Sequence, residues 1–237
     1  MKLSIIIPIY NEQDTVADVL GRIGAVRFPI EYEIILVDDA SRDTTYEAAL
    51  SAQKALGTAA PAAQVRIFRN PVNRGKGYSI RKGISESSGD IIIVQDADTE
   101  YDPGEIPRVI WPIIDGAEKV VYGSRFLGVK RPDGMALPNF VANKALTFLT
   151  NLLFGLRITD METCYKAYRA DIIKKMELKA NRFTFEPEVT AQAAKLGVRI
   201  KEVPISYSGR SAEQGKKIKS KDFFYAIGTL LCQRMTP

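Results

Sequence analysis

The sequence predicts an α/β fold, an open and mostly parallel sheet flanked by helices. Short apolar runs alternate with helical stretches along the chain. The runs 3–9, 32–37 and 91–94 are almost continuously apolar, as strands covered on both faces should be. The chain has 237 residues and is 46% hydrophobic, enough for a full core. No segment reaches the roughly 20 apolar residues that a membrane span needs.

The elements follow in a β-α-β-α order, which favours parallel strands joined by helical crossovers. We expect strands at 3–9, 32–37, 65–68, 91–94, 120–122, 164–167 and 198–207. We expect helices at 15–24, 44–56, from the turn 73–77 to about 87, and at 140–156, 169–175, 185–196 and 222–232.

The chain contains no histidine and only two cysteines, Cys164 and Cys232. The absence of histidine excludes imidazole as an acid, a base or a metal ligand. A metal would therefore be held by oxygen, which favours Mg²⁺ or Mn²⁺. Two distant cysteines form no disulfide framework, which indicates a reducing compartment, the cytoplasm.

Three acid-rich segments stand where predicted strands end: 11–12, 38–39 and 96–98. Ligands bind parallel sheets at the carboxyl ends of their strands. Helix capping explains one such segment but not three that converge on one edge. Asp98 is the first candidate metal ligand and Glu100 a further one. Asp96 would hold either the metal or the ribose and phosphate side of a ligand.

Two further segments have features that suit the binding of a phosphate group. Residues 73–77 form a glycine-rich helix start, whose free N–H groups suit an anion, although two glycines that relieve a tight turn explain it equally well. Residues 195–221 hold eight basic side chains against two acidic ones. This cluster is either a phosphate site or a solvated loop.

Four segments together resemble a known family. Ile6–Glu12 (IIPIYNE), Val37–Asp43 (VDDASRD), Asp96–Asp98 and Gly123–Arg125 are similar, in this order, to motifs of the family 2 glycosyltransferases, which have the GT-A fold. The branch most similar comprises dolichyl-phosphate mannose synthase and bacterial polyprenyl-phosphate glycosyltransferases. The resemblance implies inverting, metal-dependent transfer from a nucleotide sugar, GDP-mannose or a UDP-sugar, to a polyprenyl or dolichyl phosphate.

The resemblance also implies site residues. Residues around the donor would be Pro8, Tyr10, Glu12, Val37, Asp39, Asp96, Lys216 and Lys217. Arg125 and Arg210 would face the acceptor phosphate and would join Asp96 and Asp98 in catalysis. The whole chain, 1–237, would be one catalytic domain. Residues 1–125 would bind the donor, and 126–237 would bind the acceptor through a basic loop and a C-terminal amphipathic helix.

The acceptor is less sharply defined. Asn139 and Asn143 stand where relatives often have arginine and serine, and Cys164 replaces a glycine. A phosphate acceptor needs no base because it is already anionic. An alcohol would need one, and Asp160 or Glu162 could serve unless they cap the following turn. Transfer to a soluble saccharide or small alcohol therefore stays open.

The segments 140–156 and 222–232 are short and apolar. They either lie in a membrane interface or pack on the sheet as core. We expect peripheral association with the cytoplasmic face of a membrane, with room for an anchoring partner protein. A nucleotidyltransferase or a non-catalytic nucleotide-binding module is the remaining alternative. Aromatic residues are not interleaved with the basic run, so we expect no nucleic-acid partner.

Overall fold

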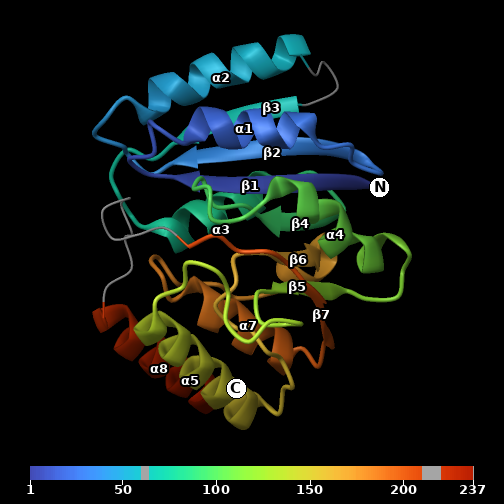
Figure 1. Ribbon diagram of the computed structural model, residues 1–237, viewed down its shortest axis with the longest axis vertical. Coiled ribbons are helices and arrows are strands. Elements are labelled where there is room, and N and C mark those ends of the chain that lie inside the picture. The colour runs from blue at the N-terminus through green and yellow to red at the C-terminus, as the bar shows by residue number, and fades with distance from the viewer. Residues whose placement is uncertain (60–63, 210–219, 237) are drawn as a thin grey trace.

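A seven-stranded sheet forms the centre of the molecule (Figure 1). The computed structural model describes residues 1–59, 64–209 and 220–236. The strands follow the order β3-β2-β1-β4-β6-β5-β7. Their bounds are β1 Lys2–Ile9, β2 Glu31–Asp38, β3 Gln64–Arg69, β4 Ile91–Val94, β5 Val120–Ser124, β6 Lys166–Arg169 and β7 Ile200–Pro204.

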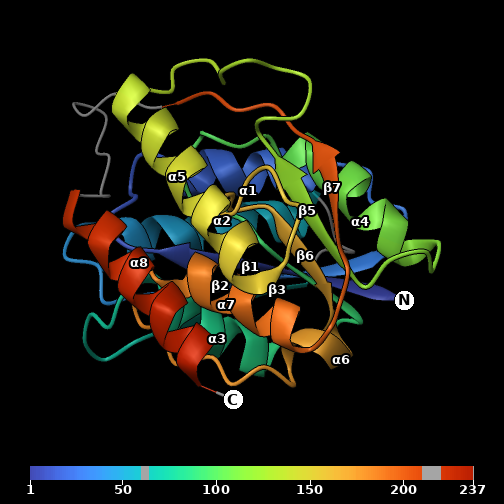
Figure 2. The ribbon, with the colours of Figure 1, turned by 90° about the horizontal axis from the view of Figure 1, so that it is seen from below.

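Helices cover both faces of this sheet. Figure 2 shows α1 and α4 on one side and α3 and α7 on the other. The helix bounds are α1 Val16–Ala25, α2 Thr45–Ala59, α3 Lys76–Glu86, α4 Ile106–Ile114, α5 Leu137–Phe154, α6 Ala170–Ile173, α7 Phe185–Lys195 and α8 Ser220–Met235, with the short 3₁₀ helix η1 at Pro103–Glu105. Because both faces are covered, the central strands are buried along their length, as their apolar runs predict.

The strand directions place most carboxyl ends at one edge. β1 pairs in parallel with β2 and β4, and β2 with β3. β6 runs antiparallel to both β4 and β5, and β5 pairs in parallel with β7. All strands except β6 therefore point the same way. The loops that follow β1, β2 and β4 consequently meet at one edge of the sheet.

The fold class predicted from the sequence, an α/β domain with a mostly parallel sheet, is confirmed. Four details differ. The helix expected at 169–175 is reduced to α6, Ala170–Ile173, because Arg169 belongs to β6. The helix α4 was not expected, and it carries Pro107 near its start and Pro112 inside it, which weaken its sequence signal. β6 lies two residues further along the chain than expected and is antiparallel. β7 is shorter than the expected 198–207 strand.

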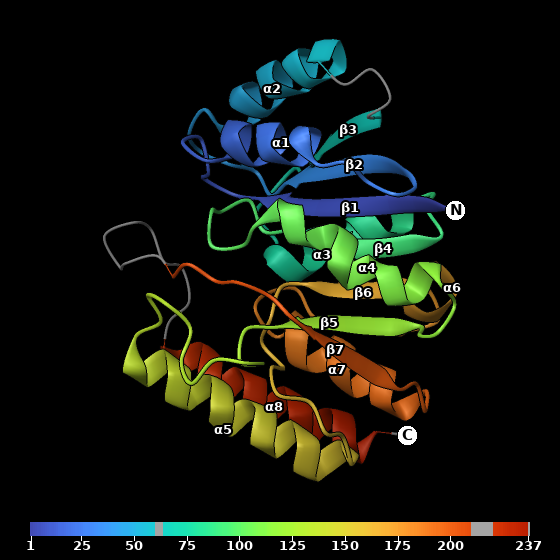
Figure 3. The same ribbon diagram turned by 45° about the vertical axis from the view of Figure 1, so that its right-hand side comes forward.

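Helices α5 and α8 lie side by side at the end of the molecule beyond β7 and α7 (Figure 3). Each is partly buried against the rest, and each also leaves apolar side chains exposed. On α5 these are Leu137, Val141, Phe148 and Leu152, and on α8 they are Phe224, Tyr225, Leu231 and Met235. The helices are thus neither purely core nor purely polar surface. None of the described helices combines the length and apolarity needed to cross a bilayer.

Candidate active site

The loops after β1 and β2 are interlocked at the carboxyl edge. Asn11 and Ala40 adopt positive φ values of 50° and 58°. The backbone N–H of Asn11 donates to Ser41 Oγ, and Arg42 N–H donates back to Asn11 Oδ1. Such backbone conformations are uncommon in residues other than glycine and concentrate at functional sites. The geometry marks this edge as the place to look for a ligand site.

Asp39 is buried and organises the loop that leads into α3. Its carboxylate accepts hydrogen bonds from the backbone N–H groups of Arg74, at 2.9 Å, and Gly75, at 2.6 Å. It also accepts one from Asn70 Nδ2 at 2.8 Å. Asp39, which the resemblance places around the donor, therefore holds the loop 70–75 against the sheet edge.

The side chain of Lys76, the residue that follows Gly75, reaches Asp96 just after the end of β4. Its ammonium lies 2.8 Å from Asp96 Oδ1 and 3.2 Å from Glu186 Oε1 on α7. Burial alone would lower the pKa of Lys76, but the two carboxylates outweigh it and hold the pKa well above its usual value. Lys76 thus stays charged and joins β4 to α7.

The backbone of residues 180–182 packs closely against the glycine-rich start of α3. A Cβ on Gly75 would clash with Asn181 O, and one on Gly77 would come within 2.6 Å of Ala180 O. Asn181 O also accepts the N–H of Tyr78. Gly75 also has a φ of 99°, so of the two interpretations of this segment, the one in which glycines relieve a tight turn fits the structure.

Asp98 and Glu100 follow on the same loop. Asp98 Oδ1 accepts the N–H of Glu100, while Glu100 Oε2 accepts the hydroxyl of Tyr207, at 3.0 Å. The part of the chain that the structure describes contains no group of three or more Asp, Glu or Cys side chains close enough to hold a metal. Asp96, Asp98 and Glu100 thus form no such triad by themselves. A cation here would need ligands from a substrate and water.

Arg125 and Asp160 form a buried ion pair. Arg125 Nε and Nη2 lie 2.7 and 2.8 Å from the two carboxylate oxygens of Asp160. Nη2 also donates to Asn143 Oδ1 on α5, and the guanidinium lies over the ring of Tyr207. Asp160 is fully buried. Its oxygens are engaged by Arg125, so it is poorly placed to act as a base.

Glu162 is in a different environment. Its Oε1 atom is buried and has no hydrogen-bond partner among the described residues. Burial, followed by repulsion from Glu186, raises the pKa of Glu162 to about 7, against the opposing effect of Lys166 and Arg125. Of the two proposed bases, Glu162 combines a pKa of about 7 with a carboxylate oxygen that has no hydrogen-bond partner among the described residues, whereas both oxygens of Asp160 are bonded to Arg125.

The remaining predicted residues fall into three groups. Pro8, Tyr10 and Glu12 are half-buried at the end of β1. Val37 is completely buried within β2, so its side chain has no surface to offer a ligand. Arg210, Lys216 and Lys217 lie outside the described residues.

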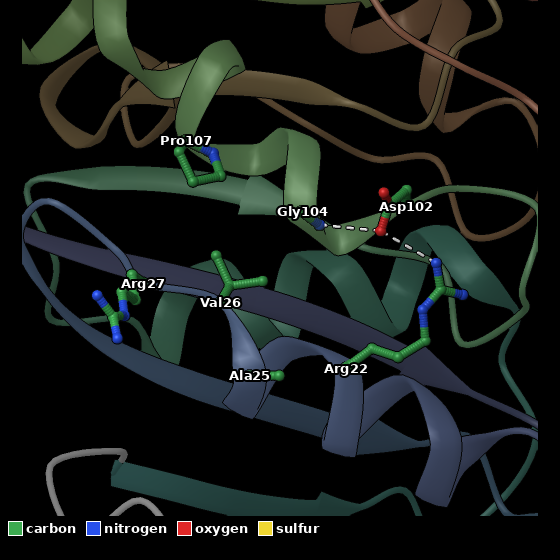
Figure 4. A pocket seen from close by; sticks show the side chains of 7 residues that line it. All are labelled: Arg22, Ala25, Val26, Arg27, Asp102, Gly104 and Pro107. Atoms are coloured by element: carbon green, nitrogen blue, oxygen red, sulfur yellow. Dashed lines mark hydrogen bonds and ion pairs between the residues drawn. The ribbon is translucent and has the colours of Figure 1, made fainter.

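A separate cavity of about 430 Å³ opens between α1 and the start of α4 (Figure 4). Its lining residues are Arg22, Ala25, Val26, Arg27, Asp102, Gly104 and Pro107. Arg22 forms a 3.0 Å ion pair with Asp102 across it. None of the predicted site residues lines this cavity.

Sequence reasoning missed Lys76 and Glu186 as site residues. Lys76 is visible only as part of the glycine-rich turn, and Glu186 only as a residue of a predicted helix. No local pattern joins two positions so far apart along the chain.

Comparisons with known proteins agree with this architecture. The model of the family described as Glycosyl transferase family 2 matches residues 4–177. The dolichol-phosphate mannosyltransferase of Pyrococcus furiosus is 30% identical over 226 residues, which cover 94% of this chain. The chain spans only 61% of that relative's length.

A UDP-N-acetylglucosamine–dolichyl-phosphate N-acetylglucosaminyltransferase of Methanococcus voltae is also 30% identical, over 90% of this chain and 89% of its own length. Among solved structures, a glucosyl-3-phosphoglycerate synthase from Mycobacterium tuberculosis, in complex with Mn²⁺, UDP and phosphoglyceric acid, superposes with a TM-score of 0.72 at 19% identity. That likeness covers 100% of this chain and 79% of the synthase chain.

The synthase likeness concerns the fold, whereas the family model matches the sequence across most of the chain. The chain therefore belongs to glycosyl transferase family 2, and it is a glycosyltransferase with a GT-A-like fold.

Proposed function

We propose that this glycosyltransferase moves a sugar, with inversion, from a nucleotide sugar to a polyprenyl phosphate at a membrane surface. The two relatives named above, a dolichol-phosphate mannosyltransferase and a dolichyl-phosphate N-acetylglucosaminyltransferase, support this class of acceptor. The observation that carries the proposal is the apolar outer face of α5 and α8. α5 also carries Asn143, which accepts a hydrogen bond from Arg125 at the end of β5.

The exposed residues of α5 recur at helical spacing. Leu137, Val141, Phe148 and Leu152 are separated by four, seven and four positions, so they form one stripe along the helix. Phe148 and Leu152 are 69% and 68% exposed. A stripe of this kind lies favourably in the boundary between lipid headgroups and acyl chains.

Charge on the two helices suits an anionic surface. α5 contains no acidic residue and one lysine, Lys144. α8 contains a single acid, Asp222, against Lys221 and Arg234, both of which are exposed. Basic residues next to an apolar stripe attract anionic lipid headgroups as well as an acceptor phosphate. This supports docking on the cytoplasmic face of a membrane, with or without an anchoring partner.

The acids after β4 fit a divalent cation that is also held by donor phosphates. Mg²⁺ is commonly bound by one or two carboxylates together with substrate phosphates and water. Lys76 already places a cation 2.8 Å from Asp96, and it leaves Asp98 as the stronger metal candidate. When bound, Mg²⁺ or Mn²⁺ would neutralise charge on the leaving nucleoside diphosphate.

Arg125 and Asn143 are proposed to mark the acceptor side. Arg125 Nη2 donates one hydrogen bond to Asn143 Oδ1, at 3.0 Å, in addition to its ion pair with Asp160. An acceptor phosphate can replace the neutral amide and gain a charge-assisted hydrogen bond. Arg210, Lys216 and Lys217 remain proposed phosphate ligands from the basic loop.

The acceptor assignment is tested by product analysis. The protein is incubated with GDP-mannose and UDP-sugars, with Mg²⁺ or Mn²⁺ and a short polyprenyl phosphate. Nucleotide release and the lipid product are then measured. We expect a sugar–phosphate–lipid product that EDTA abolishes. Transfer to a saccharide or small alcohol but not to the lipid phosphate would contradict the proposal.

Membrane docking is tested by vesicle sedimentation. We expect the wild type to bind vesicles that contain anionic lipid, and the double variant Phe148→Ser/Leu152→Ser to bind at least about tenfold more weakly. Trp111→Ser is the matched control, because Trp111 is 55% exposed on α4, away from this face. If the double variant and the control lose vesicle binding equally, α5 is not the docking surface.

The pKa of Glu162 favours one alternative. A carboxyl group with a pKa near 7 suits a general base, which an alcohol acceptor would require. Transfer to a soluble saccharide with Glu162 as base is therefore the second candidate function, and the same product analysis separates the two.

A further inference from the structure

Glu162 lies in the segment that connects α5 to β6, and most of that segment is already engaged. Asp160 pairs with Arg125, and Thr159 and Asp160 N–H groups donate to Glu202. Met161 N–H donates to Thr147 Oγ1. Glu162 Oε1, in contrast, is buried and has no partner among the described residues.

A buried carboxylate oxygen without a partner is costly. Leaving such a group unsatisfied costs about 1–3 kcal/mol, and more when it is charged. Here the pKa of Glu162 is raised to about 7, so at neutral pH a large fraction is still ionised. The oxygen therefore needs a hydrogen-bond donor that the described part of the protein does not supply.

Glu162 lies on a segment whose flanking residues contact both sides of the site, and the charges that act on it come from the same two sides. Glu186 acts on it from α7, and Glu186 contacts Lys76, which contacts Asp96 at the end of β4. Arg125 acts on it from the end of β5, on the proposed acceptor side. The group being transferred must lie between the leaving diphosphate and the acceptor phosphate. Two residues before Glu162, Asp160 pairs with Arg125, and two residues after it, Cys164 Sγ lies 3.6 Å from Val94 O at the end of β4. Glu162 therefore stands on the segment that runs between these two sides.

We propose that Glu162 accepts a hydrogen bond from a hydroxyl of the transferred sugar and selects neutral hexoses over uronic acids. This inference rests on the proposed function, because it requires a nucleotide-sugar donor. A hydroxyl supplies the donor that Oε1 lacks, and charge–dipole attraction strengthens that bond in a buried site. A uronate would instead bring a third carboxylate beside those of Glu162 and Glu186, and like charges repel.

The test measures binding, so it does not depend on turnover or on the acceptor. Calorimetry gives the dissociation constants of UDP, UDP-glucose and UDP-glucuronate, and of GDP and GDP-mannose, in the presence of Mg²⁺. The ratio between a nucleotide sugar and its nucleoside diphosphate isolates the contribution of the sugar. We expect the wild type to bind a neutral nucleotide sugar at least about tenfold more tightly than the matching uronate.

Two variants test the residue. Glu162→Ala removes the carboxylate that accepts the hydrogen bond. We expect this variant to bind neutral nucleotide sugars about tenfold more weakly, relative to its binding of the nucleoside diphosphate. Glu162→Gln removes the negative charge. We expect it to reduce, by about tenfold, the ratio between the dissociation constants of the nucleotide uronate and the neutral nucleotide sugar. Glu177→Gln, at an exposed position, is the control and should leave all ratios unchanged.

The outcomes separate the two levels of the proposal. A wild type that binds none of these nucleotide sugars would overturn the proposed function. Normal binding with ratios that do not change in the Glu162 variants would overturn only the role of Glu162. Unchanged ratios together with lost turnover would also overturn it, and would assign Glu162 to deprotonation of an alcohol acceptor.

Discussion

Asp98 is the acid on which the proposed chemistry most depends, because Lys76 already neutralises its neighbour Asp96. We expect Asp98→Asn to lower turnover about 100-fold or more, since it removes a charged oxygen from the proposed cation site. The measurement is nucleotide release with saturating donor and Mn²⁺. Asp102→Asn is the control, because Asp102 lies on the same loop but pairs with Arg22 at the separate cavity. An equal effect of both variants would show loop damage rather than lost chemistry.

The buried pair of Arg125 and Asp160 makes a prediction about stability. Replacing Asp160 by Asn leaves a buried guanidinium without its carboxylate, and breaking such a pair costs about 3–5 kcal/mol. Urea unfolding measures this loss in the free energy of unfolding. The same change at Asp171 removes a pair with Arg169 that is about half exposed, and we expect it to cost less than about 1 kcal/mol. Similar losses in both variants would contradict burial as the cause.

At the scale of elements, the start of α3 depends on close packing against 180–182. A Cβ on Gly77 would come within 2.6 Å of Ala180 O and 2.9 Å of Arg182 O, both backbone atoms that yield little. We expect Gly77→Ala to destabilise the fold by about 1–3 kcal/mol. Gly21→Ala in α1 meets nothing within 4 Å and should stabilise by about 0.5–1 kcal/mol. The two variants are compared by thermal unfolding. We expect the melting temperature to fall in Gly77→Ala and to rise in Gly21→Ala.

The elements themselves were largely predictable, and the exceptions have physical causes. The apolar runs of β1, β2 and β4 are shorter than typical helices and rich in isoleucine, which favours buried strands. α4 was missed because Pro107 and Pro112 mimic loop signals, although Pro107 stands near the helix start, where proline is tolerated. The antiparallel direction of β6 leaves no trace in a four-residue strand. Direction is decided by how the preceding helix α5 returns the chain to the sheet.

At the scale of the whole molecule, Glu33 ties several segments together. Its buried carboxylate accepts from Ser4 on β1 and from Ser88 before β4, and it pairs with Lys2 and Arg66. Burial alone would raise the pKa of Glu33, but the hydrogen bonds outweigh it and lower the pKa from 4.5 to about 2. Glu33 therefore stabilises the fold above pH 4.5, and this contribution is lost as the pH falls towards 2.

The corresponding prediction compares unfolding at several pH values. We expect Glu33→Gln to be less stable than the wild type at pH 7, and the difference to shrink between pH 4.5 and pH 2. The matched control is Glu31→Gln, at an exposed position on the same strand. A constant difference across this pH range would mean that Glu33 contributes through shape rather than charge.

The sequence by itself determined the fold class, the order of the central strands along the chain and the acidic edge at the ends of β1, β2 and β4. These follow from local burial and from the common direction of parallel strands. Only the tertiary structure decided which acid meets which cation. The Asp39 carboxylate accepts hydrogen bonds from the loop before α3, Lys76 bridges Asp96 to Glu186, and Arg125 pairs with Asp160. Within the described part of the chain, Glu162 Oε1 has no hydrogen-bond partner. Such pairings join residues far apart along the chain, so they depend on how the loops close in three dimensions rather than on any local pattern.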